Sequence, residues 1–191
     1  TGVLVSSFSQ KIYKTQVVQW TAEGEFCFSL VSNEVQIFNN TAMTSPIDKV
    51  YHKGLTQFLV TPTKSPYVSI AVFNPEAGGK PARVTLYRYT PAAEVDDYST
   101  SESAGTTSTK TTRVEGPVSS RTIFAASEAQ LTWNATGTAL LVYAHADLDA
   151  TSYYGATGLF LLQAHSDAAI KVHTACFACC VSCVLRILLS V

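Results

Sequence analysis

The residues best suited to chemistry lie in one loop, ADLDATSYYG, at residues 146–155. Asp147 and Asp149 form a D-x-D pair of the kind that begins a calcium loop, but an EF-hand continues with Asp or Asn at its fifth position and Gly at its sixth. Thr151 and Ser152 stand there instead, and no Glu closes the loop. Ser152 also lacks the flanking glycines that a serine nucleophile elbow requires. We therefore expect neither a calcium site nor a serine hydrolase, and interpret the loop as a polar connection between two strands.

The histidines offer one candidate metal pair. His145 and His165 lie at expected strand ends around the same loop, so they could meet across a hairpin. His52 and His173 are far from them in sequence. A zinc site needs at least three protein ligands, so the default interpretation is hydrogen-bonded surface histidines.

The C-terminal run CFACCVSC contains four of the five cysteines: Cys176, Cys179, Cys180 and Cys183. Zinc knuckles also use C-x-x-C, but two knuckles normally lie apart in sequence so that they can converge on a tetrahedron, whereas these two abut. The apolar run 175–191 is short for a membrane span and contains Arg186. We expect neither zinc binding nor membrane insertion, and interpret residues 173–191 as a divergent apolar tail from a mis-spliced or frame-shifted end.

Composition narrows the classes of partner. Lys and Arg number 13 against 14 Asp and Glu, giving a net charge of −1, whereas nucleic-acid binders usually carry a basic surplus. The basic residues are too dispersed in sequence to nominate RNA- or ribosome-binding positions, which stay unknown. Outside the tail only Cys27 remains, which favours a reducing compartment such as the cytoplasm. Because the chain opens on TGVLVSSFSQ without a Met or a signal peptide, we expect it to be a fragment.

The elements that must position these residues are repeated β units. Trp20 and Gly24 recur as Trp133 and Gly137, each time between short runs of β-branched and aromatic residues. A degenerate copy spans 58–73, with Val60 near the Trp position, and 84–89 would be its outer strand. We expect each Trp to pack between neighbouring sheets and each Gly to adopt the positive φ of the turn.

The repeated units and the segment between them predict the domain organisation of the chain. The segment 91–121 is polar and rich in Ser and Thr, so we expect a loop inserted between strands. The spacing of about 40 residues from Trp20 to Val60 is typical of propeller blades, and the step from Val60 to Trp133 is longer because it contains this insertion. The sequence therefore predicts an all-β fold, a partial WD40-like β-propeller of about three blades over 1–172, followed by the 173–191 tail.

The chain resembles the eukaryotic translation initiation factor 2A family. The strongest match is AHADLDATSYYGATGLFLL, supported in the expected order by VVQWTAEGEFCFSLVSNEVQIF, SPYVSIAVFNPEAGGKPARVTLYRY and AQLTWNATGTALLV. The resemblance covers roughly residues 14–172. It implies a cytoplasmic, non-enzymatic propeller without cofactors, which binds the small (40S) ribosomal subunit and promotes GTP-independent, codon-directed delivery of initiator Met-tRNA on selected mRNAs. Other initiation factors are further candidate partners.

Two other protein classes would share the propeller fold, and the number of blades predicts how the chain behaves alone. A generic WD-repeat interaction scaffold, such as a propeller subunit of the initiation factor 3 complex, would share the fold but would not need the ADLDATSYYG loop. A propeller hydrolase would need the missing G-x-S-x-G motif. Three blades are too few to close a ring, so we expect open sheet edges and a chain that alone is poorly folded or self-associating.

Overall fold

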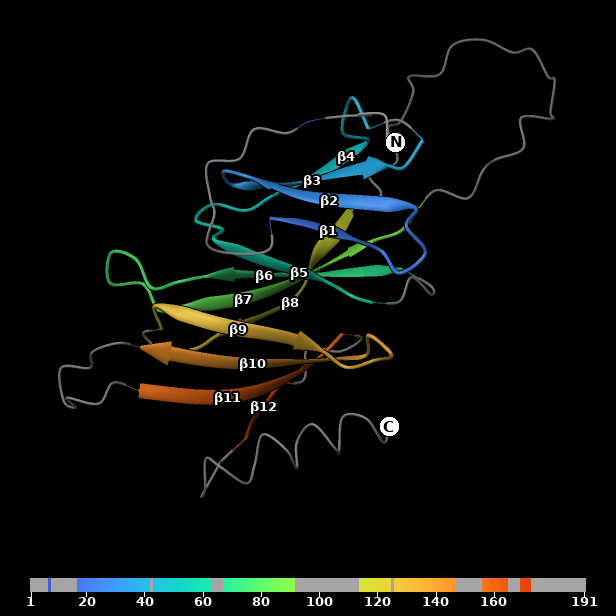
Figure 1. The fold of residues 1–191 in the computed structure, drawn as a ribbon. Coiled ribbons are helices and arrows are strands. Elements are labelled where there is room, and N and C mark those ends of the chain that lie inside the picture. The colour runs from blue at the N-terminus through green and yellow to red at the C-terminus, as the bar shows by residue number, and fades with distance from the viewer. Residues whose placement is uncertain are drawn as a thin grey trace, which may run out of the picture.

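The computed structural model describes residue 7 and residues 17–41, 43–62, 67–91, 114–124, 126–146, 156–164 and 169–172. In these residues the secondary structure is β throughout, arranged as three antiparallel sheets of four strands, each taken in chain order (Figure 1). Sheet 1 contains β1 (Val18–Trp20), β2 (Phe26–Val31), β3 (Glu34–Asn39) and β4 (Asp48–Tyr51). Sheet 2 contains β5 (Gln57–Val60), β6 (Val68–Asn74), β7 (Arg83–Tyr89) and β8 (Val114–Thr122). Sheet 3 contains β9 (Glu128–Trp133), β10 (Ala139–Ala146), β11 (Ala156–Gln163) and β12 (Ala169–Val172).

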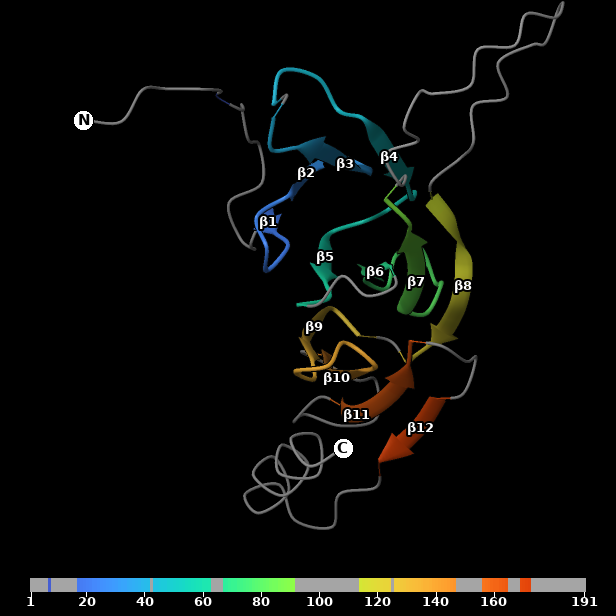
Figure 2. The same ribbon diagram turned by 90° about the vertical axis from the view of Figure 1, so that its right-hand side faces the viewer.

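The three sheets stack in chain order, with sheet 2 in the middle (Figures 1 and 2). Their first strands β1, β5 and β9 lie on one side of the stack, and β8 and β12 lie on the other (Figure 2). We call the side of a sheet that points toward the following sheet its forward face, and the opposite side its rear face. The forward face of sheet 1 packs on the rear face of sheet 2, and the forward face of sheet 2 packs on the rear face of sheet 3.

Two apolar cores hold the stack together. The core between sheets 1 and 2 includes Phe28, Ile37, Phe58, Ile70 and Tyr89. The core between sheets 2 and 3 includes Phe73, Leu86, Leu140, Val142 and Phe160. Because β6 supplies alternate residues to both cores, six of its seven residues are buried, and its sequence is apolar on both faces except for the buried Ser69 and the terminal Asn74.

The turn glycines behave as the repeat predicts. Gly24 and Gly137 both have a φ of 70°. The Gly24 amide donates to the Thr21 carbonyl at 2.9 Å, and the Gly137 amide donates to the Asn134 carbonyl at 3.1 Å. Glycine is required because a positive φ brings the Cβ of other residues close to the backbone carbonyl.

The two tryptophans differ, so the prediction for one of them is wrong. Trp133 is half-buried against the core between sheets 2 and 3, and its Nε1 donates to the Leu59 carbonyl of β5 at 3.3 Å. Trp20 is 47% exposed. The reason is position in the stack: Trp133 points from a rear face onto sheet 2, whereas the described residues place no sheet behind sheet 1.

The extent of each unit also needs correction. Each sheet has four strands, so β7 is the third strand of its sheet and the outermost is β8. Residues 114–121, predicted as part of the polar loop, pair with β7 from Tyr89↔Val114 to Arg83↔Thr122. This strand is mostly exposed and is held by backbone hydrogen bonds to one neighbour, so apolar alternation does not reveal it. Residues 92–113, the Ser/Thr-rich part, lie outside the described residues.

The fold class is confirmed as an all-β, partial propeller of three four-stranded blades. No helix among the residues that the structure describes has the length and apolar character to cross a membrane.

Candidate functional site

The ADLDATSYYG loop at residues 146–155, here called the signature loop, is located by the strands on either side of it. β10 and β11 pair along their whole length, ending at the Ala146↔Ala156 rung, so the loop closes this hairpin at the end of sheet 3. Asp147, Asp149 and Ser152 lie outside the described residues, as do His165 and the cysteines of the tail. The interpretation of the loop as a polar connection, and the rejection of the His145–His165 metal pair, therefore stay predictions.

Cys27 is fully buried on β2, and burial raises the pKa of its thiol. A buried thiol with a raised pKa is a poor nucleophile and a poor metal ligand, because the thiolate is the reactive form. In the described ranges no three His, Cys, Asp or Glu residues gather closely enough to hold a metal ion.

An open groove of about 320 Å³ lies on the forward face of sheet 3. Two neighbouring rungs of β9 and β10 form it, Glu128 opposite His145 and Gln130 opposite Tyr143, with Ala129 between them. Its polar side chains and one aromatic ring can donate, accept and stack. His145 stands directly before the signature loop, so the groove and that loop share one end of the sheet.

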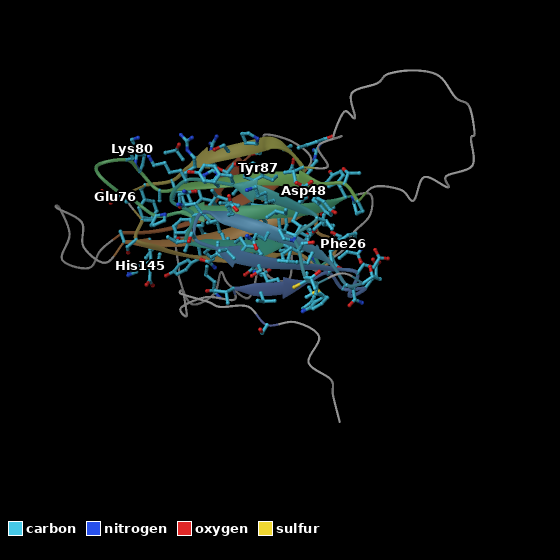
Figure 3. All side chains as sticks on the ribbon, turned by 90° about the horizontal axis from the view of Figure 1, so that it is seen from above. Phe26, Asp48, Glu76, Lys80, Tyr87 and His145 are labelled. Carbon is cyan, nitrogen blue, oxygen red and sulfur yellow. The ribbon has the colours of Figure 1, made fainter. Side chains whose placement is uncertain are left out.

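Four exposed cations gather at one end of sheet 2, although they are distant in sequence. Lys53 lies between β4 and β5, Lys80 lies between β6 and β7, Arg83 begins β7, and Arg121 lies near the end of β8 opposite Val84. Figure 3 shows Lys80 with Glu76 and His145 at this end of the sheets, and Phe26 at the other. We call Lys53, Lys80, Arg83 and Arg121 the basic end. Sequence reasoning missed it, because only the strand register places Arg83 and Arg121 at the same end of sheet 2, on adjacent strands and on opposite faces of the sheet.

Hydrogen bonds fix the connection that carries Lys53. The Asn74 side chain donates from Nδ2 to the Lys53 carbonyl at 2.7 Å, and the Gly54 amide donates to Asn33 Oδ1 at 2.9 Å. His52, the preceding residue, lies 2.6 Å from the Tyr87 hydroxyl through its Nδ1. These contacts pin the crossover from sheet 1 to sheet 2, so the basic end stands on a fixed backbone.

The electrostatics of this crossover follow from burial and from the basic end itself. Burial lowers the pKa of His52, and the Arg83 charge lowers it further, while a hydrogen bond with Asn74 opposes both effects. Burial also raises the pKa of Tyr87. At neutral pH His52 is therefore a neutral structural group, and the positive charge here belongs to the lysines and arginines.

A family model matches the part of the chain that contains sheet 3. Residues 121–180 match the family model "Eukaryotic translation initiation factor eIF2A". This match covers sheet 3 and the signature loop, and it runs past Val172, so where the tail begins stays a prediction.

Relatives named eukaryotic translation initiation factor 2A extend the similarity over most of the chain. The protein from Schizosaccharomyces pombe is 32% identical over 85% of this chain and 24% of its own length. The protein from Caenorhabditis elegans is 28% identical over 90% of this chain and 26% of its own length. The chain thus spans about a quarter of the length of these curated relatives.

A solved structure shows the same arrangement of strands. The structure described as "Crystal structure of the eukaryotic initiation factor" superposes with a TM-score of 0.61 at 28% identity, over 86% of this chain and 34% of its own chain. Family model, relatives and solved structure agree with the motifs in the sequence, so the chain belongs, as a partial chain, to the eukaryotic translation initiation factor 2A family.

Proposed function

We propose that this chain is part of a translation initiation factor and acts as a non-enzymatic β-propeller scaffold in the cytoplasm. Its partners would be the small (40S) ribosomal subunit and initiator Met-tRNA, which it would help to deliver without GTP on selected mRNAs. The observation that carries the proposal is the match of residues 121–180 to the initiation factor family model. The named relatives, similar over 85% and 90% of the chain, support it.

The basic end is the surface best suited to RNA in this proposal. A chain with a net charge of −1 can bind phosphates only through a local concentration of cations, and the candidates are the four cations at this end of sheet 2, which Arg83 and Arg121 extend to both faces of the sheet and which Glu76 partly offsets beside Lys80. Their backbone is fixed by the β7–β8 pairing and by the Asn74 contact, so little ordering entropy opposes binding.

A pull-down tests the function itself. Tagged chain is incubated with cell extract, and the captured RNA is probed for 18S rRNA and initiator tRNA. Enrichment of both over an elongator tRNA is the expected result. Capture of initiation factor 3 subunits without either RNA would favour the generic scaffold, and enrichment of nothing would refute the proposal for this chain.

A second experiment tests the basic end separately. Gln substitutions of Lys80, Arg83 and Arg121, made singly and together in a triple variant, are compared with Lys49→Gln. This control removes one charge from sheet 1, where Lys49 pairs with Glu34 at 3.2 Å. Each phosphate contact contributes about 0.7–0.9 to the slope of log K against log salt, so the triple variant should lose a slope of about 2 while Lys49→Gln keeps it. If the slope of log K against log salt is unchanged in all variants, the basic end is not part of the RNA-binding surface. That result would not contradict the proposed function.

A further inference from the structure

The cations of the basic end divide between the two faces of sheet 2. Arg121 pairs with Val84 of β7, which belongs to the core between sheets 2 and 3. Arg83, the preceding residue of β7, lies on the face toward sheet 1 and pairs with Asn74 of β6. The Asn74 side chain in turn binds the Lys53 carbonyl at 2.7 Å. Lys53 and Arg83 are therefore both neighbours of Asn74, and they form the half of the basic end that faces sheet 1.

This half of the basic end contains a histidine. His52 precedes Lys53 in the chain and is half-buried, and its Nδ1 lies 2.6 Å from the Tyr87 hydroxyl of β7. The two rings meet edge to face, with their centroids 5.8 Å apart. The His52 amide donates to the Asn33 carbonyl at 2.8 Å, so the backbone is fixed as well as the ring. An ionisable group is thus held in place beside two cations.

The structure holds an unused hydrogen-bond acceptor for the charged form of this histidine. Asn74 Oδ1 is buried, and in the described part of the chain it has no hydrogen-bond partner. A hydrogen bond with Asn74 favours the charged ring of His52. A neutral imidazole has one N–H, whereas an imidazolium has two. Protonation would therefore satisfy a buried acceptor that is otherwise orphaned, while the Tyr87 hydroxyl can accept the other N–H.

Burial and one nearby charge keep His52 neutral in the free chain. Burial lowers its pKa most, and the Arg83 guanidinium lowers it further, against the hydrogen bond with Asn74. The effect of the charge can be reversed from outside, because a phosphate bound by Lys53 and Arg83 brings a negative charge to the ring. A nearby negative charge favours the imidazolium. Since linkage is reciprocal, phosphate binding and protonation of His52 should each favour the other.

The other charged groups around this crossover lie farther from His52 or on other faces. Asp48 begins β4, whereas His52 follows the end of that strand. Glu34 and its cross-strand partner Tyr51 lie on the opposite face of sheet 1. The residues of β8 that face sheet 1 are uncharged, namely Val114, Ser120 and Thr122. The connection between β6 and β7 contributes Glu76 and Lys80, and the Glu76 amide bonds to the segment that leads into β9. Lys53 and Arg83 are thus the cations through which a bound phosphate can act on the ring.

We propose that RNA binding at this half of the basic end is coupled to proton uptake by His52: phosphates bound by Lys53 and Arg83 favour a proton on the ring, and Asn74 Oδ1 accepts the hydrogen bond of the added N–H. The proton comes from solvent, and no covalent bond forms. The inference rests on the proposed binding of RNA at the basic end. Because the complex binds more protons than the free chain, affinity for RNA should rise as the pH falls through the titration of His52.

The affinity for an oligouridylate at two pH values tests the coupling. Uracil and phosphodiester groups do not titrate between about pH 5.5 and 7.5, so a change in affinity over this range belongs to the protein. The Kd of the unmodified chain should fall by about five- to tenfold from about pH 7.5 to 5.5. His52→Gln should lose most of this pH dependence. His145→Gln removes another histidine at the same end of the sheets and is the matched control, which should retain it (Figure 3).

NMR measures the same coupling in the unmodified chain, with His52→Gln used to assign the His52 Cε1–H signal. On saturation with oligouridylate, the midpoint of its titration should move to higher pH by about 0.7 to 1 pH unit, which corresponds to the same five- to tenfold factor. Circular dichroism at both pH values confirms that each chain keeps its β content.

Two results would overturn the inference while leaving the proposed function intact, provided that the pull-down enriches 18S rRNA and initiator tRNA. One is an equal pH dependence of affinity in the unmodified and His52→Gln chains. The other is a His52 midpoint that oligouridylate does not move. A chain that binds no oligouridylate at either pH would overturn both the inference and the role of the basic end in RNA binding.

Discussion

Replacing Gln19 of β1 by Leu should destabilise the chain. Gln19 is 9% exposed and bridges the first strands of two sheets. Its Nε2 donates to the Phe58 carbonyl at 2.8 Å, and its Oε1 accepts from the Val60 amide at 3.0 Å. Leu fills a similar volume but satisfies neither group, and each buried group left unpaired costs about 1–3 kcal/mol. The better packing of Leu offsets part of this, so we expect a net loss of about 2–4 kcal/mol.

Urea unfolding followed by circular dichroism measures this loss. With a slope of about 1–3 kcal/mol per molar urea, the midpoint should fall by about 1–2 M at an unchanged slope. Gln36→Leu is the matched control, since Gln36 is half-buried on the opposite face of sheet 1 and should shift the free energy of unfolding by about 0.5 kcal/mol or less. Equal midpoints for the Gln19 and Gln36 variants would refute the view that Gln19 couples the two sheets.

Two further substitutions probe other contacts. Gly158→Ala should lower the free energy of unfolding by about 1–3 kcal/mol, because the new Cβ would lie 2.6 Å from Phe124 Cε1 and 2.8 Å from Phe160 Cε2. Thr157→Ala, at the exposed neighbouring position, is the control and should leave the melting temperature unchanged. An unchanged melting temperature for Gly158→Ala would contradict this packing. The pKa of His52 is lowered in the folded state, so the unfolded chain binds more protons, and stability should fall as the pH drops below the unfolded pKa of about 6.5. His52→Gln should flatten that part of the pH–stability curve, and an unaltered curve would assign the acid sensitivity to other groups.

The sequence predicts the strands that alternate and the turns that contain glycine. Gly24 and Gly137 have the expected positive φ, and the apolar runs around them become paired strands with buried faces. These features are local: a turn conformation and a period of two follow from neighbouring residues alone. The family follows from the motifs for the same reason, since their order along the chain is itself a sequence property.

The features that the sequence misses depend on tertiary position. β8 carries mostly exposed polar residues, and β7, the strand with which it pairs, is separated from it by the Ser/Thr-rich segment, so no local pattern identifies it. Trp20 and Trp133 have the same W-x-x-x-G spacing but different burial, because Trp133 faces sheet 2, whereas no sheet of the described residues faces Trp20. The basic end likewise exists only after Arg83 and Arg121 are placed on adjacent strands.

Sheet 2, in the middle of the stack, packs against both other sheets. Among the described residues, sheet 2 contributes to both apolar cores, whereas sheets 1 and 3 each contribute to one of them. In a linear array, stability is a sum of unit terms and nearest-neighbour terms, so damage to an end sheet removes one interface and damage to the middle sheet removes both. Tolerance to core substitutions should therefore differ between the sheets. A disruptive core substitution in β6 should separate all three sheets, whereas one in β2 or β10 should leave the other two sheets packed around their shared core.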